Sequence, residues 1–197
     1  VCGITFATAP EGRYRYLATM VADSAEVPAG YYDSLLVTSA TDGLSSPSDF
    51  DPARHRAVIN ETGSFSGDLN FAAHMKAAHG ISLGDVMQSG AHLRSITMVA
   101  AGEADLTAID RISFSLARHA VPHGVDGVSV IGRTASHPGI AFVADAGLPD
   151  LVVRKLRATI LEFRDDPAWP ELQVILGVAD ITVLDPQIYA PMASVAA

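Results

Sequence analysis

The sequence has little of what several large classes of protein require. It contains one cysteine, Cys2, so no disulfide can form within the chain. No run of about 18 apolar residues is present, which argues against a membrane-spanning helix. The 13 Lys and Arg side chains are outnumbered by 22 Asp and Glu, and the net charge of −9 does not suit the phosphate backbone of nucleic acid. Residues 1–10 also lack the basic start and long apolar core of a signal peptide.

The composition that remains is that of a well-packed globular protein. Of the 197 residues, 49% are hydrophobic and 18% are charged. A chain of this length forms one large domain or two small lobes that share a core. A negative net charge does not exclude a small anionic ligand, because a few convergent backbone N–H groups can hold one.

The middle of the chain alternates patterns typical of strands and helices, with short connections. We expect strands at 56–60, 85–90, 105–110 and 127–134, and helices at 66–79, 93–104 and 111–119. Such alternation predicts an α/β fold with a mostly parallel sheet. Outside this region we expect strands at 1–7, 14–23 and 31–39, the longest helix at 148–166, and a tail at 172–192 made of a helix followed by irregular chain.

Two segments are good candidates for joints between lobes. One is the stretch 31–43, and the other is Pro138-Gly139. Two crossings on either side of an α/β unit predict an inner lobe, 39–137, inserted into a first lobe built from 1–38 and 138–197. The connection would be a two-strand hinge, which allows the lobes to close on a ligand.

Polar side chains follow three successive strands of the predicted inner lobe. Ser64 and Ser66 come after the first of these strands, His92 after the second and Asp110 after the third. Because the carboxyl ends of parallel strands meet at one edge of a sheet, we expect these four side chains on a single rim. Ligands of open α/β sheets bind at such an edge.

The chemistry of this rim favours an anion. Gly63 and Gly67 allow a tight turn and a close approach of the backbone, and the N–H groups that start the following helix are donors without intrahelical partners. The hydroxyls of Ser64 and Ser66 and the ring of His92 add further donors.

Asp110 adds a negatively charged acceptor, which would repel a fully ionised anion. A phosphonate, phosphite or hydrogen phosphate keeps one acidic proton and can donate it to Asp110, whereas sulfate cannot. Asp110 is therefore a candidate selectivity element.

Simpler interpretations exist for each of these residues. Ser66 or Asp110 can be an ordinary helix N-cap, and His92 can be a packed histidine. The loop is not a Walker A motif, because no Gly-Lys-Ser/Thr follows it. We expect the other histidines, at 55, 74, 79, 119, 123 and 137, to lie on the surface, since none has metal-ligand spacing. The sequence predicts no catalytic residue, no metal site and no cofactor.

The order of the motifs resembles that of a known family. "YYDSLLVT", "INETGSFSG", "SGAHLRSITMVAAGEADLTAIDR", "SHPGIAFVAD" and "YAPM" follow one another across almost the whole chain. This series resembles the phosphate/phosphite/phosphonate substrate-binding proteins of ABC transporters, which are type II periplasmic binding proteins. The resemblance implies two α/β lobes, a location in the periplasm or otherwise outside the cytoplasm, and an ABC permease as partner.

The resemblance also implies a set of ligand-binding residues. Ser64, Ser66 and the Phe65 backbone would bind the oxyanion together with His92 and Asp110. An aromatic from the hinge region, Tyr31 or Tyr32, would line the cleft between the lobes.

Two departures from the family pattern bear on this expectation. The family's loop usually reads Ser-Thr-Ser-Gly, so Phe65 replaces a hydroxyl residue and one side-chain donor is lost. The family also has first-lobe segments before the stretch that resembles "VCGITF", so we expect either a truncated chain or a shortened relative with an incomplete first lobe.

The resulting hypothesis is a solute-binding protein that captures a small oxyanion in an interlobe cleft for uptake. A stand-alone sensor domain would share every one of these site residues. An enzyme on the same scaffold would need a nucleophile on the rim, and the sequence shows none.

Overall fold

The structure is a computed structural model that describes residues 1–195, and it divides into two compact units. Unit 2 comprises Asp33–Ser136, and unit 1 comprises Val1–Tyr32 and the chain from His137 onward. The predicted inner lobe, 39–137, starts later than unit 2 because strand β3 (Ser34–Ser39) pairs with β6 and β7 of that unit. A boundary after residue 38 would leave β3 outside the sheet that it completes.

Unit 2 is built on a five-stranded sheet in the order β5-β4-β6-β3-β7. The other strands are β4 (Ala57–Ile59), β5 (Val86–Gln88), β6 (Leu106–Asp110) and β7 (Val128–Arg133). β4 runs parallel to β5 and β6, whereas β3 is antiparallel to both of its neighbours, β6 and β7. The sheet is therefore mixed, with two parallel and two antiparallel pairs, whereas a mostly parallel sheet was predicted; the difference comes from β3, the one reversed strand.

The register of β3 shows where the chain enters and leaves unit 2. Ser34 lies opposite Asp110, the last residue of β6, and Leu35 lies opposite Arg133, the last residue of β7. Both crossings between the units therefore lie at the edge of the sheet where the parallel strands end.

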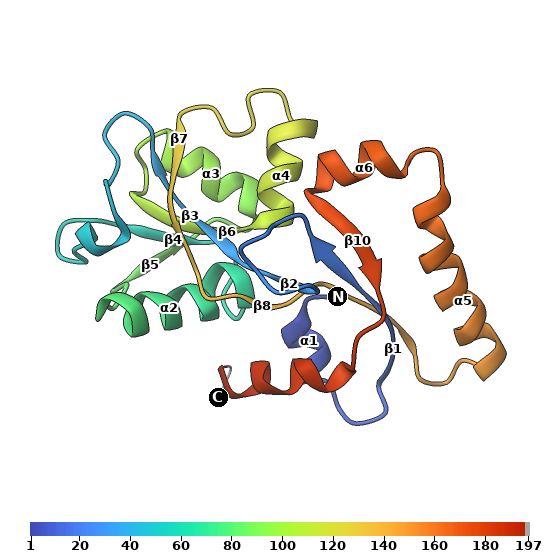
Figure 1. Ribbon diagram of the computed structural model, residues 1–197. Helices are drawn as coiled ribbons and strands as arrows, with labels where there is room; N and C mark the ends of the chain where they lie inside the picture. The colour runs from blue at the N-terminus through green and yellow to red at the C-terminus, as the bar shows by residue number, and fades with distance from the viewer. Residues whose placement is uncertain (196–197) are drawn as a thin grey trace. The chain divides into compact units, whose positions relative to one another are not determined.

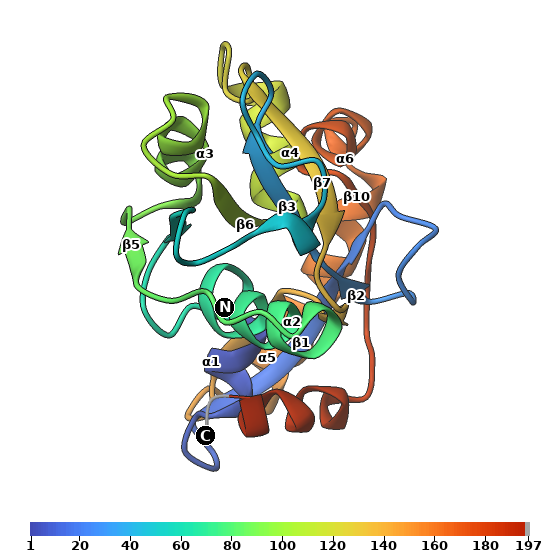
Figure 2. The ribbon, with the colours of Figure 1, turned by 90° about the vertical axis from the view of Figure 1, so that its left-hand side faces the viewer.

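Helices cover both faces of this sheet (Figures 1 and 2). They are α2 (Asn70–His79) on one face, and α3 (His92–Ala100) and α4 (Arg111–Ala120) on the other. Adjacent residues of β3 alternate between the faces, so that Leu36 packs with Phe71 and Met75 of α2 while Val37 packs with Ile96 and Ala117. The period of two in the strands thus divides the core of unit 2 into two layers.

The helix that follows the candidate anion loop starts differently from the prediction. Its first turn, Phe65–Leu69, is a single π-helical turn, labelled η2, and α2 proper begins at Asn70. The predicted end is found, since Gly80 adopts a left-handed conformation (φ +71°) and closes α2.

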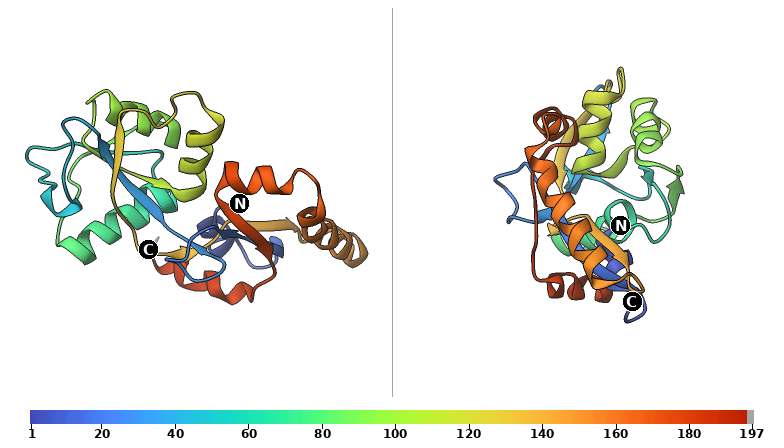
Figure 3. Two further views of the ribbon diagram at one scale, coloured as in Figure 1. Left: turned by 45° about the horizontal axis from the view of Figure 1, so that its top comes forward. Right: turned by 90° about the vertical axis from the view of Figure 1, so that its right-hand side faces the viewer.

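Unit 1 contains an antiparallel three-stranded sheet in the order β10-β1-β9. Its strands are β1 (Tyr14–Ala22), β9 (Ala141–Asp145) and β10 (Val178–Thr182). Its helical segments are α1 (Gly3–Ala7), α5 (Asp150–Glu162), η3 (Phe163–Asp165), α6 (Trp169–Leu176) and η4 (Pro186–Val195). The long helix α5 packs against β1, and α1 packs against η4 (Figure 3).

Two sequence predictions for unit 1 were wrong. The predicted strand 1–7 contains the short helix α1 at Gly3–Ala7 instead, because an apolar run this short fits the period of a helix as well as that of a strand, and its packing against η4 decides the outcome. The predicted irregular tail contains β10, which follows directly on the left-handed Gly177 that ends α6 and pairs with β1.

The chain's single tryptophan, Trp169, lies in the apolar layer of unit 1. Its ring packs edge-on against Phe163, with 5.9 Å between the ring centroids. The two rings line a wholly apolar cavity together with Met20, Phe142 and Ile160.

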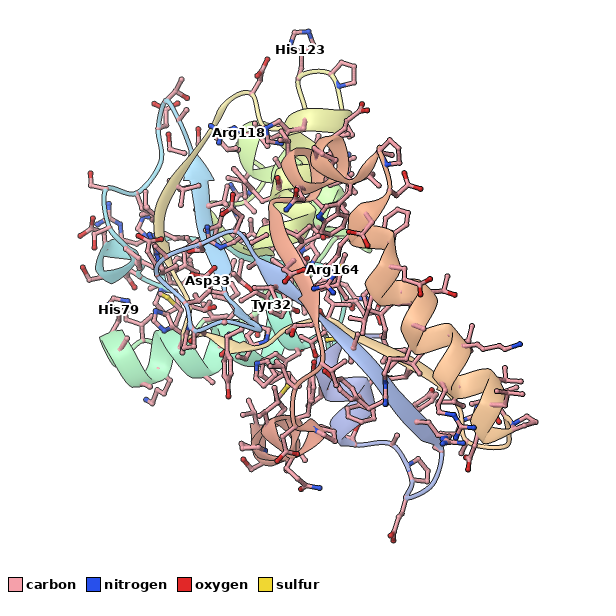
Figure 4. All side chains as sticks on the ribbon, turned by 45° about the vertical axis from the view of Figure 1, so that its right-hand side comes forward. Tyr32, Asp33, His79, Arg118, His123 and Arg164 are labelled. Atoms are coloured by element: carbon pink, nitrogen blue, oxygen red, sulfur yellow. The ribbon has the colours of Figure 1, made fainter. Side chains whose placement is uncertain are left out.

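At the two crossings, β2 (Tyr31–Tyr32) pairs with β8 (His137–Pro138). Tyr32 ends the first segment of unit 1 and Asp33 begins unit 2 (Figure 4). His137 is buried against the Tyr32 ring, with centroids 4.2 Å apart, so the prediction that it lies on the surface was wrong. Among the helices of residues 1–195, none has the length and apolarity needed to cross a membrane.

Candidate functional site

Three of the predicted rim residues meet at the carboxyl edge of the unit 2 sheet. Ser66 follows β4, His92 follows β5, and Asp110 ends β6. His92 Nε2 lies 3.2 Å from Ser66 Oγ and 3.1 Å from Asp110 Oδ2. The parallel-strand rule therefore placed these three side chains correctly.

The loop before η2 supplies backbone donors. The carbonyl oxygen of Ser64 accepts the first intrahelical bonds, from the N–H groups of Asp68 at 3.1 Å and Leu69 at 3.0 Å. The N–H groups of Ser66 and Gly67 come before that first bond. Backbone N–H groups at this end of a helix have no acceptor within the helix. They lie at the positive end of η2 and α2, where an anion is stabilised.

The serines of the loop do not act as ordinary helix caps. Ser64 occupies the N-cap position, but its side chain makes no capping hydrogen bond. Ser66 is already inside the π turn, and its hydroxyl lies against His92. The loop is shaped instead by Asp68, whose Oδ2 accepts the Gly63 N–H at 2.8 Å, and by the left-handed backbone of Gly63 (φ +80°).

Gly67 leaves no room for a side chain at this point. A Cβ atom there would overlap Asn60 Oδ1 and lie 2.9 Å from His92 Cε1. The loop thus packs directly against the His92 ring, and only glycine permits that approach.

Asp110 has two partners. Its Oδ1 accepts the Ser113 N–H at 2.8 Å and caps α4, while Oδ2 faces His92. The interpretation as an N-cap and the interpretation as a site residue were set out as alternatives, but the two carboxylate oxygens allow both at once.

His92 is held in a largely buried environment. Its side chain is 13% exposed, and burial lowers the pKa of the imidazole, while the neighbouring Asp110 carboxylate opposes that shift. A neutral ring with its proton on Nε2 can donate to Asp110, which leaves the Ser66 hydroxyl proton available to a ligand. Within residues 1–195, His92 Nδ1 and Asn60 Oδ1 are buried atoms without a hydrogen-bond partner.

The arrangement differs from a Ser-His-Asp hydrolytic triad. In a triad the histidine uses one ring nitrogen for the serine and the other for the aspartate. Here the single nitrogen Nε2 of His92 faces both Ser66 and Asp110. The buried Nδ1 has no carboxylate to orient it, so the three side chains do not form a proton relay of that kind.

A buried polar network, not predicted from the sequence, supports the loop from below. Ser34 Oγ donates to the Ser66 carbonyl at 3.1 Å, and the Asn70 amide donates to Thr134 Oγ1 and to the Ala135 carbonyl, both at 3.0 Å. Ser34 and Thr134 adjoin the two crossings. Their partners are far apart in the sequence, so no local pattern indicates the network.

The remaining predicted site residues, Phe65, Ser64 and Tyr31, are not among the side chains that meet at His92. Phe65 is buried, with 2% of its surface exposed, so its contribution to an anion site is restricted to the backbone. Ser64 is half-buried at the start of η2. Tyr31 belongs to unit 1, where it pairs with Pro138, and its role stays a prediction. Across residues 1–195, no group of three or more His, Cys, Asp and Glu side chains is arranged to hold a metal ion.

Comparison with known proteins gives a family match over nearly the whole chain. Residues 1–189 match the family model described as "ABC transporter, phosphonate, periplasmic substrate-binding protein". A comparison with curated protein sequences finds no match.

Several solved structures share the fold. A binding protein component of an ABC phosphonate transporter from Pseudomonas aeruginosa is 18% identical with a TM-score of 0.74, over 93% of this chain and 60% of that one. PhnD1 from Prochlorococcus marinus, solved with methylphosphonate, is 14% identical with a TM-score of 0.73, over 93% and 70% of the two chains. A Xanthomonas citri protein bound to ATP is 18% identical with a TM-score of 0.67, over 98% and 74%.

These matches confirm the predicted fold class and the resemblance noted in the sequence. The chain spans 60% to 74% of the length of those three structures. Since the family model covers residues 1–189 of 197, the chain belongs to the family of periplasmic substrate-binding proteins of phosphonate ABC transporters.

Proposed function

We propose that this protein captures a small phosphorus oxyanion that keeps one acidic proton, at the rim formed by Ser64, Ser66, His92 and Asp110. Phosphonate, phosphite and hydrogen phosphate are the candidate ligands. The observation that carries the proposal is the meeting of Ser66 Oγ and Asp110 Oδ2 at one nitrogen of His92, beside a helix N-terminus.

The donors of the rim fit the oxygens of a tetrahedral anion. The N–H groups of Ser66 and Gly67 lie at the positive end of a helix, and the Ser66 hydroxyl lies next to them. The His92 ring faces Asp110 through Nε2, and a bound anion would favour the charged imidazolium over the neutral ring. Hydrogen bonds to an anion are stronger than those between neutral groups.

The acceptor sets the class of anion. Asp110 Oδ1 is engaged by the Ser113 N–H, so Oδ2 is the oxygen that faces the rim. A ligand with a P–OH group can donate to that oxygen, whereas sulfate presents only bare oxygens at neutral pH. The carboxylate would therefore disfavour sulfate by direct repulsion.

The family supports the same ligand class. Its description names phosphonate, and one structure that shares the fold holds methylphosphonate. Solute capture for an ABC transporter is the family's function, and its location is outside the cytoplasm. We extend this to a cognate permease as the partner and to Tyr31 as a further contact of the ligand.

Calorimetric titration of the full chain with phosphite, methylphosphonate, phosphate and sulfate tests the proposal. We expect binding of the phosphorus anions and weak or no binding of sulfate. Ser64→Ala and Ser66→Ala should each weaken binding by about 1–3 kcal/mol, the value of a hydrogen bond to a charged group. Ser129→Ala, an exposed serine of β7 in the same unit, is the matched control and should bind like the parent. Full affinity in the double Ser64/Ser66 variant would refute the assignment of the site.

A further inference from the structure

A shallow groove runs between α3 and α4 from the rim described above. It is lined by His92, Leu93, Ser113, Leu116, Ala117 and Val121 and has a volume of about 210 Å³. We propose that this α3–α4 groove holds a short apolar substituent on the phosphorus of the bound oxyanion. The proposal rests on the proposed function and narrows its ligand class to small alkylphosphonates and their ester counterparts.

The groove is continuous with the anion site through two residues. His92 lines the groove and also lies within 3.2 Å of Ser66 Oγ. Ser113 lines the groove, and its N–H is bonded to Asp110 Oδ1. Helices α3 and α4 contact each other, and the groove lining includes His92, the first residue of α3, and Ser113 in the first turn of α4.

The lining predicts what kind of substituent fits. Apart from His92, every side chain of the groove is uncharged, and four of the six are aliphatic. An ammonium group placed there would lose water without gaining a partner of opposite charge. A hydrocarbon group would lose water at no such cost.

Two leucines give the groove an apolar surface that unit 2 itself leaves uncovered. Leu93 and Leu116 are 41% and 42% exposed. A hydrocarbon lying between them would cover part of both side chains. The groove thus offers the oxyanion site an apolar extension in the direction away from the η2 donors.

The volume sets the size of the substituent. Drug-sized ligands occupy sites of about 300–1,000 Å³, and this groove has a volume of about 210 Å³. The liquid-state share of one water is about 30 Å³, so the groove has room for a group of only a few carbons.

The test is a calorimetric series on the full chain with methyl-, ethyl-, propyl- and 2-aminoethylphosphonate. We expect affinity to rise about twofold to fourfold with each added methylene from methyl to propyl, with fourfold as the limit for complete burial. The aminoethyl compound, similar in length to propyl, should bind more weakly than propyl. Ethylphosphonate and methyl phosphate have the same shape, so comparing them distinguishes a phosphonate ligand from a phosphate ester.

A double variant, Leu93→Ser with Leu116→Ser, should reduce the propyl-to-methyl affinity ratio to less than twofold. The matched control is Val130→Ser, which removes an apolar side chain of similar exposure, 47%, from β7 of the same unit, outside the groove. The control should keep the ratio of the parent protein. Circular dichroism on each variant establishes that the fold is retained.

The outcomes separate this inference from the proposed function. Suppose that phosphite and methylphosphonate bind, but the propyl-to-methyl affinity ratio is near one in the parent protein or is unchanged in the double leucine variant. The groove is then not the subsite, and the assignment of the anion site is unaffected. If no phosphorus anion binds at all, the proposed function fails and the groove assignment fails with it.

Discussion

Arg111 holds the carboxylate of Asp33 with two parallel hydrogen bonds, from Nε at 2.8 Å and from Nη2 at 3.0 Å. The Asp33 carboxylate is 1% exposed and the Arg111 side chain 18% exposed. The Arg111 N–H also donates to the Asp33 carbonyl at 3.1 Å. The first residue of unit 2 is therefore fixed to the first residue of α4, directly beside Asp110.

Arg111→Met should destabilise the protein by about 3–5 kcal/mol, because it leaves the buried Asp33 charge without its guanidinium. Urea unfolding followed by circular dichroism measures the change. The control is Arg13→Met, which breaks an exposed pair with Asp145 whose side chains are 57% and 59% exposed. That change should cost no more than about 1 kcal/mol. Equal effects of the two substitutions would contradict a structural role for the Asp33–Arg111 pair.

Gly67→Ala should weaken anion binding strongly, because the new Cβ would push Asn60 and the His92 ring away from the loop. The expected loss of stability is about 1–3 kcal/mol, as for other overpacked sites. Calorimetry with methylphosphonate and urea unfolding give the two quantities.

Gly63→Ala and Gly12→Ala form a matched pair of controls for that result. Both glycines have a left-handed backbone, with φ of +80° and +74°, and open space where a Cβ would lie. Each substitution should cost about 1–2 kcal/mol of stability from backbone strain. Only Gly63→Ala, in the anion loop, should also weaken binding. Equal binding by the two variants would show that the conformation of the loop does not matter to the ligand.

Asp110→Asn should change selectivity more than stability. Asparagine is as good an N-cap as aspartate, so α4 keeps its start. If its oxygen takes over the cap on Ser113, the amide NH₂ faces the rim in place of Oδ2. Sulfate affinity relative to phosphate should then rise about tenfold, or about 1.4 kcal/mol. Parallel titrations of both anions on parent and variant decide the matter, and an unchanged ratio would leave Asp110 as a cap alone.

The stability of the protein should fall as the pH drops below about 6.5, and His92 should account for part of the fall. Burial lowers the pKa of folded His92 below the ordinary histidine value of 6.5. The unfolded chain therefore takes up the proton first, and stability is lost as pH falls from 6.5 through the lower, folded pKa. His92→Gln should lose less stability than the parent between pH 7.5 and pH 5.5, measured by urea unfolding.

His74 needs a parallel variant, because burial and the nearby His79 lower its pKa as well. The double variant His74→Gln/His92→Gln should show the smallest dependence on pH in this range. A His92→Gln variant that follows the parent curve would mean that the ring is not held neutral in the folded protein.

The sequence predicted which side chains meet at the rim better than it predicted the connections around them. Ser66 follows the buried strand β4, His92 follows the exposed edge strand β5, and Asp110 ends β6. The geometry of parallel sheets brings such positions together whether or not the strand is buried. The hydrogen bonds of these residues depend on side-chain direction, so the double role of Asp110 could not be read from its position.

Contacts between distant segments account for most of what was missed. Asp33 and Arg111 are charged residues of ordinary appearance, and only the register of β3 against β6 brings them together. The pairing of β10 with β1 likewise depends on a partner far away in the chain. Residues 1–7 were assigned the wrong period because five helical residues carry too few turns for a periodic signal.

The position of Trp169 determines what spectroscopy can report. It is the chain's one tryptophan, and it is buried in the apolar layer of unit 1, whereas the four rim residues Ser64, Ser66, His92 and Asp110 belong to unit 2. Tryptophan fluorescence therefore monitors the melting of unit 1, while far-ultraviolet circular dichroism monitors the helices of both units. Coincident denaturation curves from the two signals would show that the units melt as one cooperative block, and separate curves would give each unit its own melting temperature.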